Sequence, residues 1–239
     1  NEGRPTKVEG NPDHPDSNGA TDLFTQASIL NLYAPDRARK YSENGTVTSK
    51  ADARAKLEEM ANGSDKLAFL MPSANSPSRD RLLAKIQNDL GARAGFFVHE
   101  AIDFGVHTRA ASAMLGEPVR PDWKFDRADV ILSLDCDFIG TEEESARHIR
   151  DFARGRKLSR NQGRMSRLYV MEALMSQTGA NADHRLRAPS TNIAAAAAFI
   201  AGQLGIEVTG ATGSLSGSEW LTACVADLKM EAHRGKTLV

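Results

Sequence analysis

The stretch Ala128-Asp-Val-Ile-Leu-Ser-Leu-Asp-Cys-Asp137 decides the fold class. It predicts a strand over Asp129–Leu134, because a nearly unbroken apolar run is typical of a strand buried on both faces of a parallel sheet. Thr141 and Glu144 follow with the spacing of a capping box, which predicts a helix that Gly155 ends. The stretch therefore indicates a strand followed directly by a helix.

Similar apolar runs and helical segments alternate on both sides of this strand. Ser76 and Pro77 predict the N-cap and first residue of a helix that reaches Leu90, with Gly91 as its end. Further strands are predicted at Lys66–Met71, Gly95–His99 and Arg167–Glu172, and another starts at Thr237. We predict a doubly wound α/β fold, in which these strands are neighbours in a mostly parallel sheet with helices on both faces.

The two ends of the chain suggest its domain organisation. The first residues are rich in proline and glycine and have no sustained period, which indicates loop structure, and a helix is predicted around Asp22–Leu32. An alanine-rich helix is predicted over Ser190–Gln203. We expect residues 1–45 to form an extended N-terminal segment packed on the domain. Residues 46–239 are expected to form a Rossmann-like α/β domain that is truncated at its C-terminus, because a strand starts where the sequence stops.

Composition limits the possible partners. Thirty basic and 31 acidic residues give a net charge of -1, so there is no charge surplus to attract a phosphate backbone, and we expect no nucleic acid partner. The longest apolar run, Ile193–Ala201, is far shorter than the ~20 residues that a membrane helix needs. We therefore expect no direct membrane insertion.

The two cysteines give no sign of a metal centre. Cys136 and Cys224 lie far apart and belong to no C-x-x-C pair, and the histidines are scattered without ligand spacing. Both cysteines are interpreted as small buried hydrophobes. The sequence predicts no metal, no cofactor held by this fragment alone and no catalytic nucleophile.

Two acidic residues follow the central strand, where open parallel sheets bind ligands. Asp135 and Asp137 could hold Mg²⁺ and present a nucleophile, a pattern superficially similar to phosphohydrolases of the haloacid dehalogenase type, although Ile139 stands where those enzymes have threonine. The simpler interpretation is that Asp137 faces solvent or caps the next helix. Residues 142–144, three glutamates, would then form that helix's solvated first turn.

Two later segments also carry polar chemistry. Thr178-Gly-Ala-Asn-Ala-Asp-His-Arg185 places an acid, an imidazole and a guanidinium after a strand, which would suit acid/base chemistry. The structural alternative is an ion-pair network of Asp183 with Arg185 or Arg187. The glycine-rich segment Gly210–Gly217 matches no phosphate-binding motif and is interpreted as a connecting loop.

Taken in order, five segments resemble the TAT-variant-translocated molybdopterin oxidoreductase family, which includes the large iron–sulfur subunit of alternative complex III. The segments are residues 3–15 (GRPTKVEGNPDHP), 32–37 (LYAPDR), 128–138 (ADVILSLDCDF), 165–168 (MSRL) and 178–187 (TGANADHRLR). The resemblance implies part of the molybdopterin oxidoreductase fold in a membrane-associated quinol:acceptor complex. It also implies partner subunits, a periplasmic location, and molybdopterin dinucleotide and iron–sulfur clusters elsewhere in the whole protein.

The chain departs from the active members of that family in three places. No cysteine follows the early loop, Asp135 and Asp137 replace a Gly-x-Asn-Pro-like turn, and Asn192 replaces an acid. Two carboxylates would repel a diphosphate by roughly 4 kcal/mol per close pair at an effective dielectric of about 20. We therefore expect a non-catalytic scaffold, the alternative being part of an active molybdopterin-dependent enzyme. The vestigial cofactor pocket is predicted at Asp135, Asp137, Thr178, Asp183, His184 and Arg185.

Overall fold

The computed structural model describes residues 3–14, 17–63, 65–74, 76–117, 119–161, 163–208 and 218–239. The chain forms two compact units. Unit 1 consists of Asn1–Ile29 together with His107–Val239, and unit 2 consists of Leu30–Val106. Both tryptophans, Trp123 and Trp220, belong to unit 1. The predicted division at residue 45 stays a prediction.

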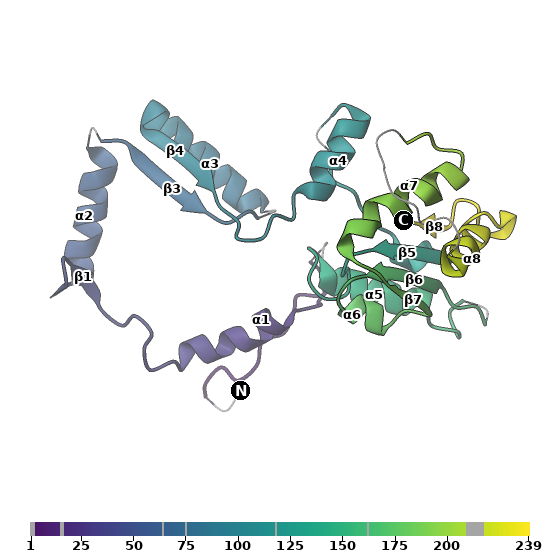
Figure 1. The fold of residues 1–239 in the computed structure, drawn as a ribbon. Helices are drawn as coiled ribbons and strands as arrows, with labels where there is room; N and C mark the ends of the chain where they lie inside the picture. Colours follow the sequence, from purple (N-terminus) through teal and green to yellow (C-terminus); the bar gives the residue numbers. More distant parts are fainter. Residues whose placement is uncertain are drawn as a thin grey trace. The chain divides into compact units, whose positions relative to one another are not determined.

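Unit 1 is built on a four-stranded sheet in the order β7-β6-β5-β8 (Figure 1). The strands are β5 (Val130–Leu134), β6 (Arg167–Glu172), β7 (His184–Arg187) and β8 (Thr237–Leu238). All three pairings are parallel, with Ile131 opposite both Leu168 and Leu238. The predicted strands at 129–134, 167–172 and 237 are confirmed, as is the parallel α/β class.

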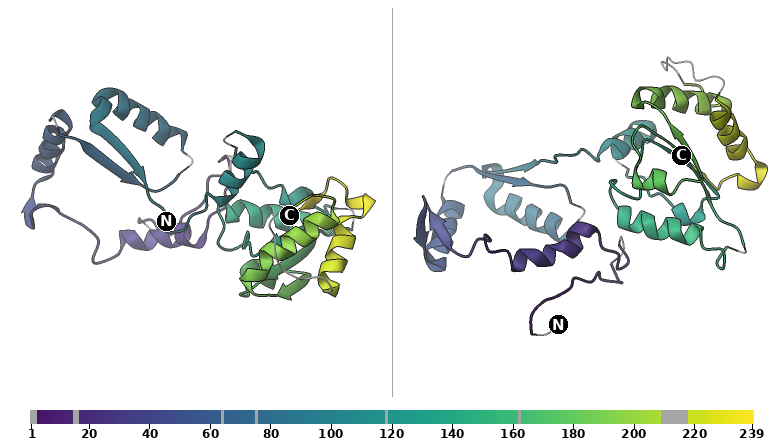
Figure 2. Two further views of the ribbon diagram at one scale, coloured as in Figure 1. Left: turned by 45° about the horizontal axis from the view of Figure 1, so that its top comes forward. Right: turned by 60° about the horizontal axis from the view of Figure 1, so that its bottom comes forward.

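Helices cover both faces of this sheet (Figure 2). Alternate residues of β5 and β6 point to opposite faces, so each face has its own core. On one face Val130 and Met171 pack with Ile200 of α7 (Ile193–Gln203) and Leu221 of α8 (Glu219–Leu228). On the other face Ile131 and Leu168 pack with Phe138 and with Phe152 of α5 (Ser145–Gly155). The two-faced core confirms the doubly wound arrangement.

Other helices and several 3-10 turns occur elsewhere in the chain. They are α1 (Leu23–Ala27), α4 (Val106–Leu115) and α6 (Gln177–Ala180), with 3-10 turns at Ser28–Leu32, Gly91–Arg93, Phe125–Arg127, Ser190–Asn192 and Glu231–His233. Asp22 caps α1, its side chain accepting a hydrogen bond from the Thr25 amide at 2.6 Å. None of the helices among the described residues is both long and apolar enough to cross a membrane.

Unit 2 holds two small sheets. β1 (Tyr41–Glu43) and β2 (Thr46–Thr48) form an antiparallel hairpin, and β3 (Leu67–Met71) pairs in parallel with β4 (Ala94–Val98). Its helices are α2 (Lys50–Asn62) and α3 (Pro77–Leu90). Ser76 caps α3, its hydroxyl accepting from the Arg79 amide at 3.3 Å, and Gly91 follows the helix with a φ of 57°. Both predicted ends of this helix are confirmed.

Two predictions about the fold are wrong. β3 and β4 belong to a separate sheet rather than to the sheet of β5 and β6, because an apolar run shows that a strand is suited to burial but does not specify its partner. The capping box predicted at Thr141 and Glu144 is also wrong. The amides of Gly140, Thr141 and Glu142 all bond to the carbonyl of Asp137, so these residues form a turn and α5 begins only at Ser145.

His148 of α5 makes the stability of unit 1 sensitive to acid. The imidazole is buried beside the ring of Phe125, with ring centroids 4.9 Å apart. Burial, and then the nearby charge of Arg147, lower the pKa of His148 to about 4 from the usual 6.5. Between these two values the unfolded chain binds a proton that the folded chain does not, so stability falls as the pH falls.

We expect the free energy of unfolding to drop by about 2 kcal/mol between roughly pH 7 and pH 5 because of His148. Urea denaturation followed by tryptophan fluorescence measures it, since both tryptophans lie in unit 1. His148→Leu should flatten this dependence. An equally steep dependence in that variant would show that another group is responsible.

Candidate functional site

Asp135 and Asp137 lie at the carboxyl edge of the sheet, directly after β5. Asp135 is exposed and has a φ of 52°, in the left-handed region that aspartate tolerates better than most residues. Its carboxylate accepts hydrogen bonds from the Ser190 hydroxyl at 3.0 Å and from the Ala173 amide at 3.4 Å. This carboxylate therefore fixes the turn after β5 to the segments that follow β6 and β7.

Asp137 connects the same turn to α6. Its Oδ1 atom accepts from the amide of Thr178 at 2.9 Å, from the Thr178 hydroxyl at 2.7 Å and from the Gly140 amide at 3.2 Å. Thr178 is fully buried, and its Oγ1 accepts in turn from the Ile139 amide at 3.1 Å. Asp137 is thus a structural acceptor rather than a solvated acid, because three internal donors engage its Oδ1 atom.

A buried ion pair lies beside these residues at the same edge. Glu172, the last residue of β6, accepts from Nε of Arg185 at 2.6 Å and from the Ser176 hydroxyl at 2.6 Å. The Glu172 side chain is only 4% exposed. A Cβ atom on Gly179 would lie 1.7 Å from the Glu172 carboxylate, so a larger residue there would displace the Glu172 side chain. Sequence reasoning missed Glu172, although an acid ending a predicted strand was a usable signal.

Asp183 lies at the opposite, amino edge of the sheet, just before β7. Its carboxylate pairs with both terminal nitrogens of Arg156, at 2.6 and 2.8 Å, and accepts from the Leu168 amide at 2.8 Å. Burial opposes its ionisation, but the Arg156 guanidinium and the Leu168 amide hold the pKa of Asp183 below its usual value. The interpretation that Asp183 pairs with Arg185 or Arg187 is wrong, because Arg156 after α5 reaches this edge and Arg185 turns to Glu172.

The structure therefore separates the six predicted site residues. Asp135, Asp137 and Thr178 come together at the carboxyl edge, and Arg185 joins them through Glu172. Asp183 is at the other edge, and the His184 ring stacks on Tyr169 at 4.6 Å. The glycine-rich segment 210–217 lies outside the described residues.

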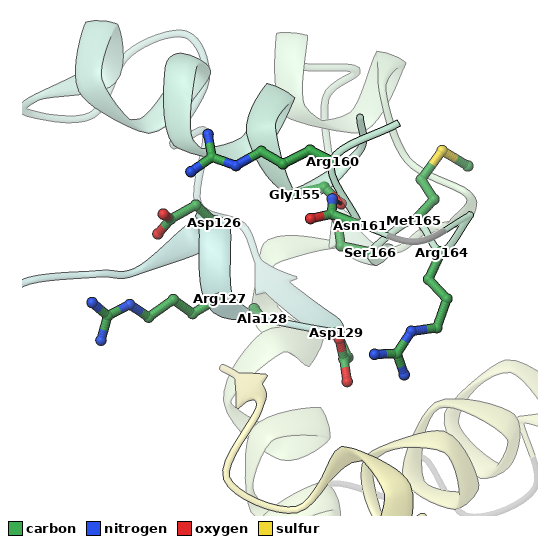
Figure 3. A pocket seen from close by; sticks show the side chains of 10 residues that line it. All are labelled: Asp126, Arg127, Ala128, Asp129, Gly155, Arg160, Asn161, Arg164, Met165 and Ser166. Atoms are coloured by element: carbon green, nitrogen blue, oxygen red, sulfur yellow. Dashed lines mark hydrogen bonds between the residues drawn. The ribbon is translucent and has the colours of Figure 1, made fainter. Parts of the chain in front are cut away.

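A second site feature is a pocket of 240 Å³ at the amino edge of the sheet. It is lined by Asp126, Arg127, Ala128, Asp129, Gly155, Arg160, Asn161, Arg164, Met165 and Ser166 (Figure 3). Arg160 and Asp126 lie on one side of it and Arg164 and Asp129 on the other, while the Arg127 guanidinium points away. The carboxylate of Asp129 lies 3.4 Å from His233 and 3.6 Å from Lys236, so part of the pocket's charge is already balanced.

The three glutamates at 142–144 are not a solvated helical turn. Glu144 has a φ of 61° and precedes α5, and Arg120 pairs with Glu143 at 3.3 Å and with Glu144 at 2.6 Å. Glu142 instead contacts the His107 ring, with Oε2 and Nε2 3.4 Å apart. The reason is the Asp137 turn described above, which places each carboxylate in a different direction.

Fold and site together define an α/β protein with a Rossmann-like parallel sheet whose carboxyl edge is fixed by internal carboxylate bonds. No family model matches the chain. The chain is 29% identical over 143 residues to the menaquinone reductase, molybdopterin-binding-like subunit, of Nitratidesulfovibrio vulgaris. The match covers 56% of this chain and 20% of that protein, so the chain spans about a fifth of the length of this relative. This similarity supports a relationship to molybdopterin-oxidoreductase-like proteins.

Proposed function

We propose that this chain is part of a molybdopterin-oxidoreductase-like subunit of a membrane-associated respiratory complex of the quinol:acceptor type. In this proposal the present chain is a scaffold that binds no pterin dinucleotide. It contacts other subunits of the complex on the periplasmic side of the membrane. The similarity to a molybdopterin-binding-like subunit supports the assignment to such a complex. The resemblance to the TAT-variant-translocated family, which includes alternative complex III, supports the finer assignment.

One observation carries the scaffold role: the polar groups at the carboxyl edge are already bonded to one another. Asp137 takes the Thr178 and Gly140 amides that a diphosphate would need as donors, and Glu172 takes the Arg185 guanidinium. An anion at this edge would meet the carboxylates of Asp135 and Asp137 and would have to displace internal bonds. We therefore infer that the polar groups at this edge stabilise the fold and do not bind a nucleotide.

Isothermal titration of the folded chain with guanosine diphosphate, and with extracted molybdopterin guanine dinucleotide, tests the proposal. We expect no saturable heat for either ligand at micromolar concentrations. Elemental analysis of the intact subunit should find less than one molybdenum or tungsten ion per chain. Asp135→Asn serves as a control that removes one repelling charge without changing the turn. Saturable micromolar binding by the unmodified chain, weakened in Arg185→Lys, would show that the edge is a working cofactor site.

A further inference from the structure

Three potential metal ligands of different chemistry meet in unit 1. They are His107 near the start of α4, Cys136 after β5 and Glu142 in the turn before α5. One donor atom from each, an imidazole nitrogen, a thiol sulfur and a carboxylate oxygen, lies within 4.8 Å of the other two. All three side chains are partly buried, and among the described residues no other group of three or more such ligands was found.

The surrounding contacts fix the backbone at Cys136 and Glu142 and pack the ring of His107. The Ser133 hydroxyl donates to the carbonyl of Cys136 at 2.6 Å. The amide of Glu142 donates to the carbonyl of Asp137 at 3.2 Å. This hydrogen bond closes the turn between Cys136 and Glu142. Trp123 packs edge-on against the His107 ring, with centroids 6.2 Å apart. The backbone positions that carry the three donors are therefore fixed close together.

The charges around the group favour a cation. Arg120 forms ion pairs with Glu143 and Glu144. The Glu142 carboxylate instead contacts the imidazole of His107. A dication between the three donors would be attracted by the Glu142 carboxylate and would offset the negative charge of a Cys136 thiolate.

We propose that His107, Cys136 and Glu142 bind a divalent transition metal ion of the zinc class, with solvent in the fourth position. Zn–N and Zn–O bonds of about 2.0–2.1 Å at a tetrahedral angle place two donors roughly 3.3 Å apart. The observed separation of His107 Nε2 and Glu142 Oε2 is 3.4 Å. On binding, the S–H bond of Cys136 breaks, its proton goes to solvent and the S–metal bond forms. The thiolate and carboxylate then neutralise the dication.

This inference goes beyond the scaffold role and does not depend on it. The expectation that the chain holds no metal rests on spacing along the chain, and positions 107, 136 and 142 match no local motif. The three residues meet only because β5 and the turn after it bring Cys136 and Glu142 to the start of α4. The fold thus assembles a ligand set that the linear sequence does not display.

Titration of the metal-free chain with Zn²⁺ and with Co²⁺ tests the proposal. We expect one ion per chain with a micromolar or tighter Kd, and a thiolate-to-cobalt charge-transfer band in the absorption spectrum. His107→Ala, Cys136→Ala and Glu142→Gln should each weaken binding by roughly 100-fold, since losing a residue that only hydrogen-bonds to a metal ligand already costs about 10–100-fold. Glu143→Gln and Cys224→Ala are matched controls that should leave the affinity unchanged.

Circular dichroism verifies that each variant is folded before its affinity is compared. The charge-transfer band of the unmodified chain is a second readout that needs no variant, because only sulfur coordination produces it. Stoichiometric cobalt binding without that band would overturn the proposal, as would failure of the unmodified chain to bind either ion. Equal affinity in the folded Cys136→Ala and Cys224→Ala variants would overturn it as well.

Discussion

Asp137→Ala is expected to lower the free energy of unfolding of unit 1 by about 3 kcal/mol. The carboxylate of Asp137 accepts three hydrogen bonds, from the Thr178 amide, the Thr178 hydroxyl and the Gly140 amide. Thr178 is fully buried, so its amide would lose its partner in a place that water does not reach. Urea denaturation followed by tryptophan fluorescence measures the loss.

Asp135→Asn is the matched control for this prediction. Both residues are acids at the same edge, but Asp135 is exposed, and asparagine keeps both its left-handed conformation and an acceptor oxygen. We expect a change of less than about 1 kcal/mol. If the two variants lost equal stability, Asp137 would not be the connection between the β5 turn and α6 that the hydrogen bonds indicate.

Arg185→Ala is expected to cost roughly 3–5 kcal/mol, the largest effect of any single change considered for this edge. The substitution removes the guanidinium 2.6 Å from Glu172 and leaves a carboxylate that is only 4% exposed. The hydrogen bond from the Ser176 hydroxyl remains but cannot neutralise the charge. Urea denaturation followed by tryptophan fluorescence measures this loss as well.

Two further variants test the cause of that loss. Arg187→Ala removes an exposed arginine from the same strand and should change stability by less than about 0.5 kcal/mol. The double variant Glu172→Gln with Arg185→Met removes both charges together and should be more stable than Arg185→Ala alone. A loss at Arg185 no larger than at Arg187 would mean that the pair contributes little to the edge.

The scaffold proposal and these stability predictions share one physical basis. A parallel sheet places the ends of β5 and β6 at one edge, where amides and cations of a nucleotide site would be available to a ligand. Here Asp137 and Glu172 occupy those donors. Internal bonds to carboxylates stabilise the fold, but any anionic ligand would have to compete with them.

The sequence by itself determined the fold class and several element boundaries. The apolar run at 130–134 required burial on two faces, and the two core clusters show that burial. Ser76, Pro77 and Gly91 determined both ends of α3, because caps act through hydrogen bonds and backbone angles within a few residues. Asp135 and Asp137 were also placed correctly at a strand's carboxyl end, since that follows from chain order alone.

Only the tertiary structure decided which strands and side chains meet. The apolar runs of β3 and β4 did not reveal that they pair apart from β5 and β6. Likewise, Arg156 rather than Arg185 binds Asp183. His107, Cys136 and Glu142 also converge although 29 and 6 positions separate them along the chain (136 - 107 and 142 - 136). Local spacing determines caps and strand faces, whereas pairings between distant residues depend on strand order and on how far each side chain reaches, which the sequence pattern does not encode.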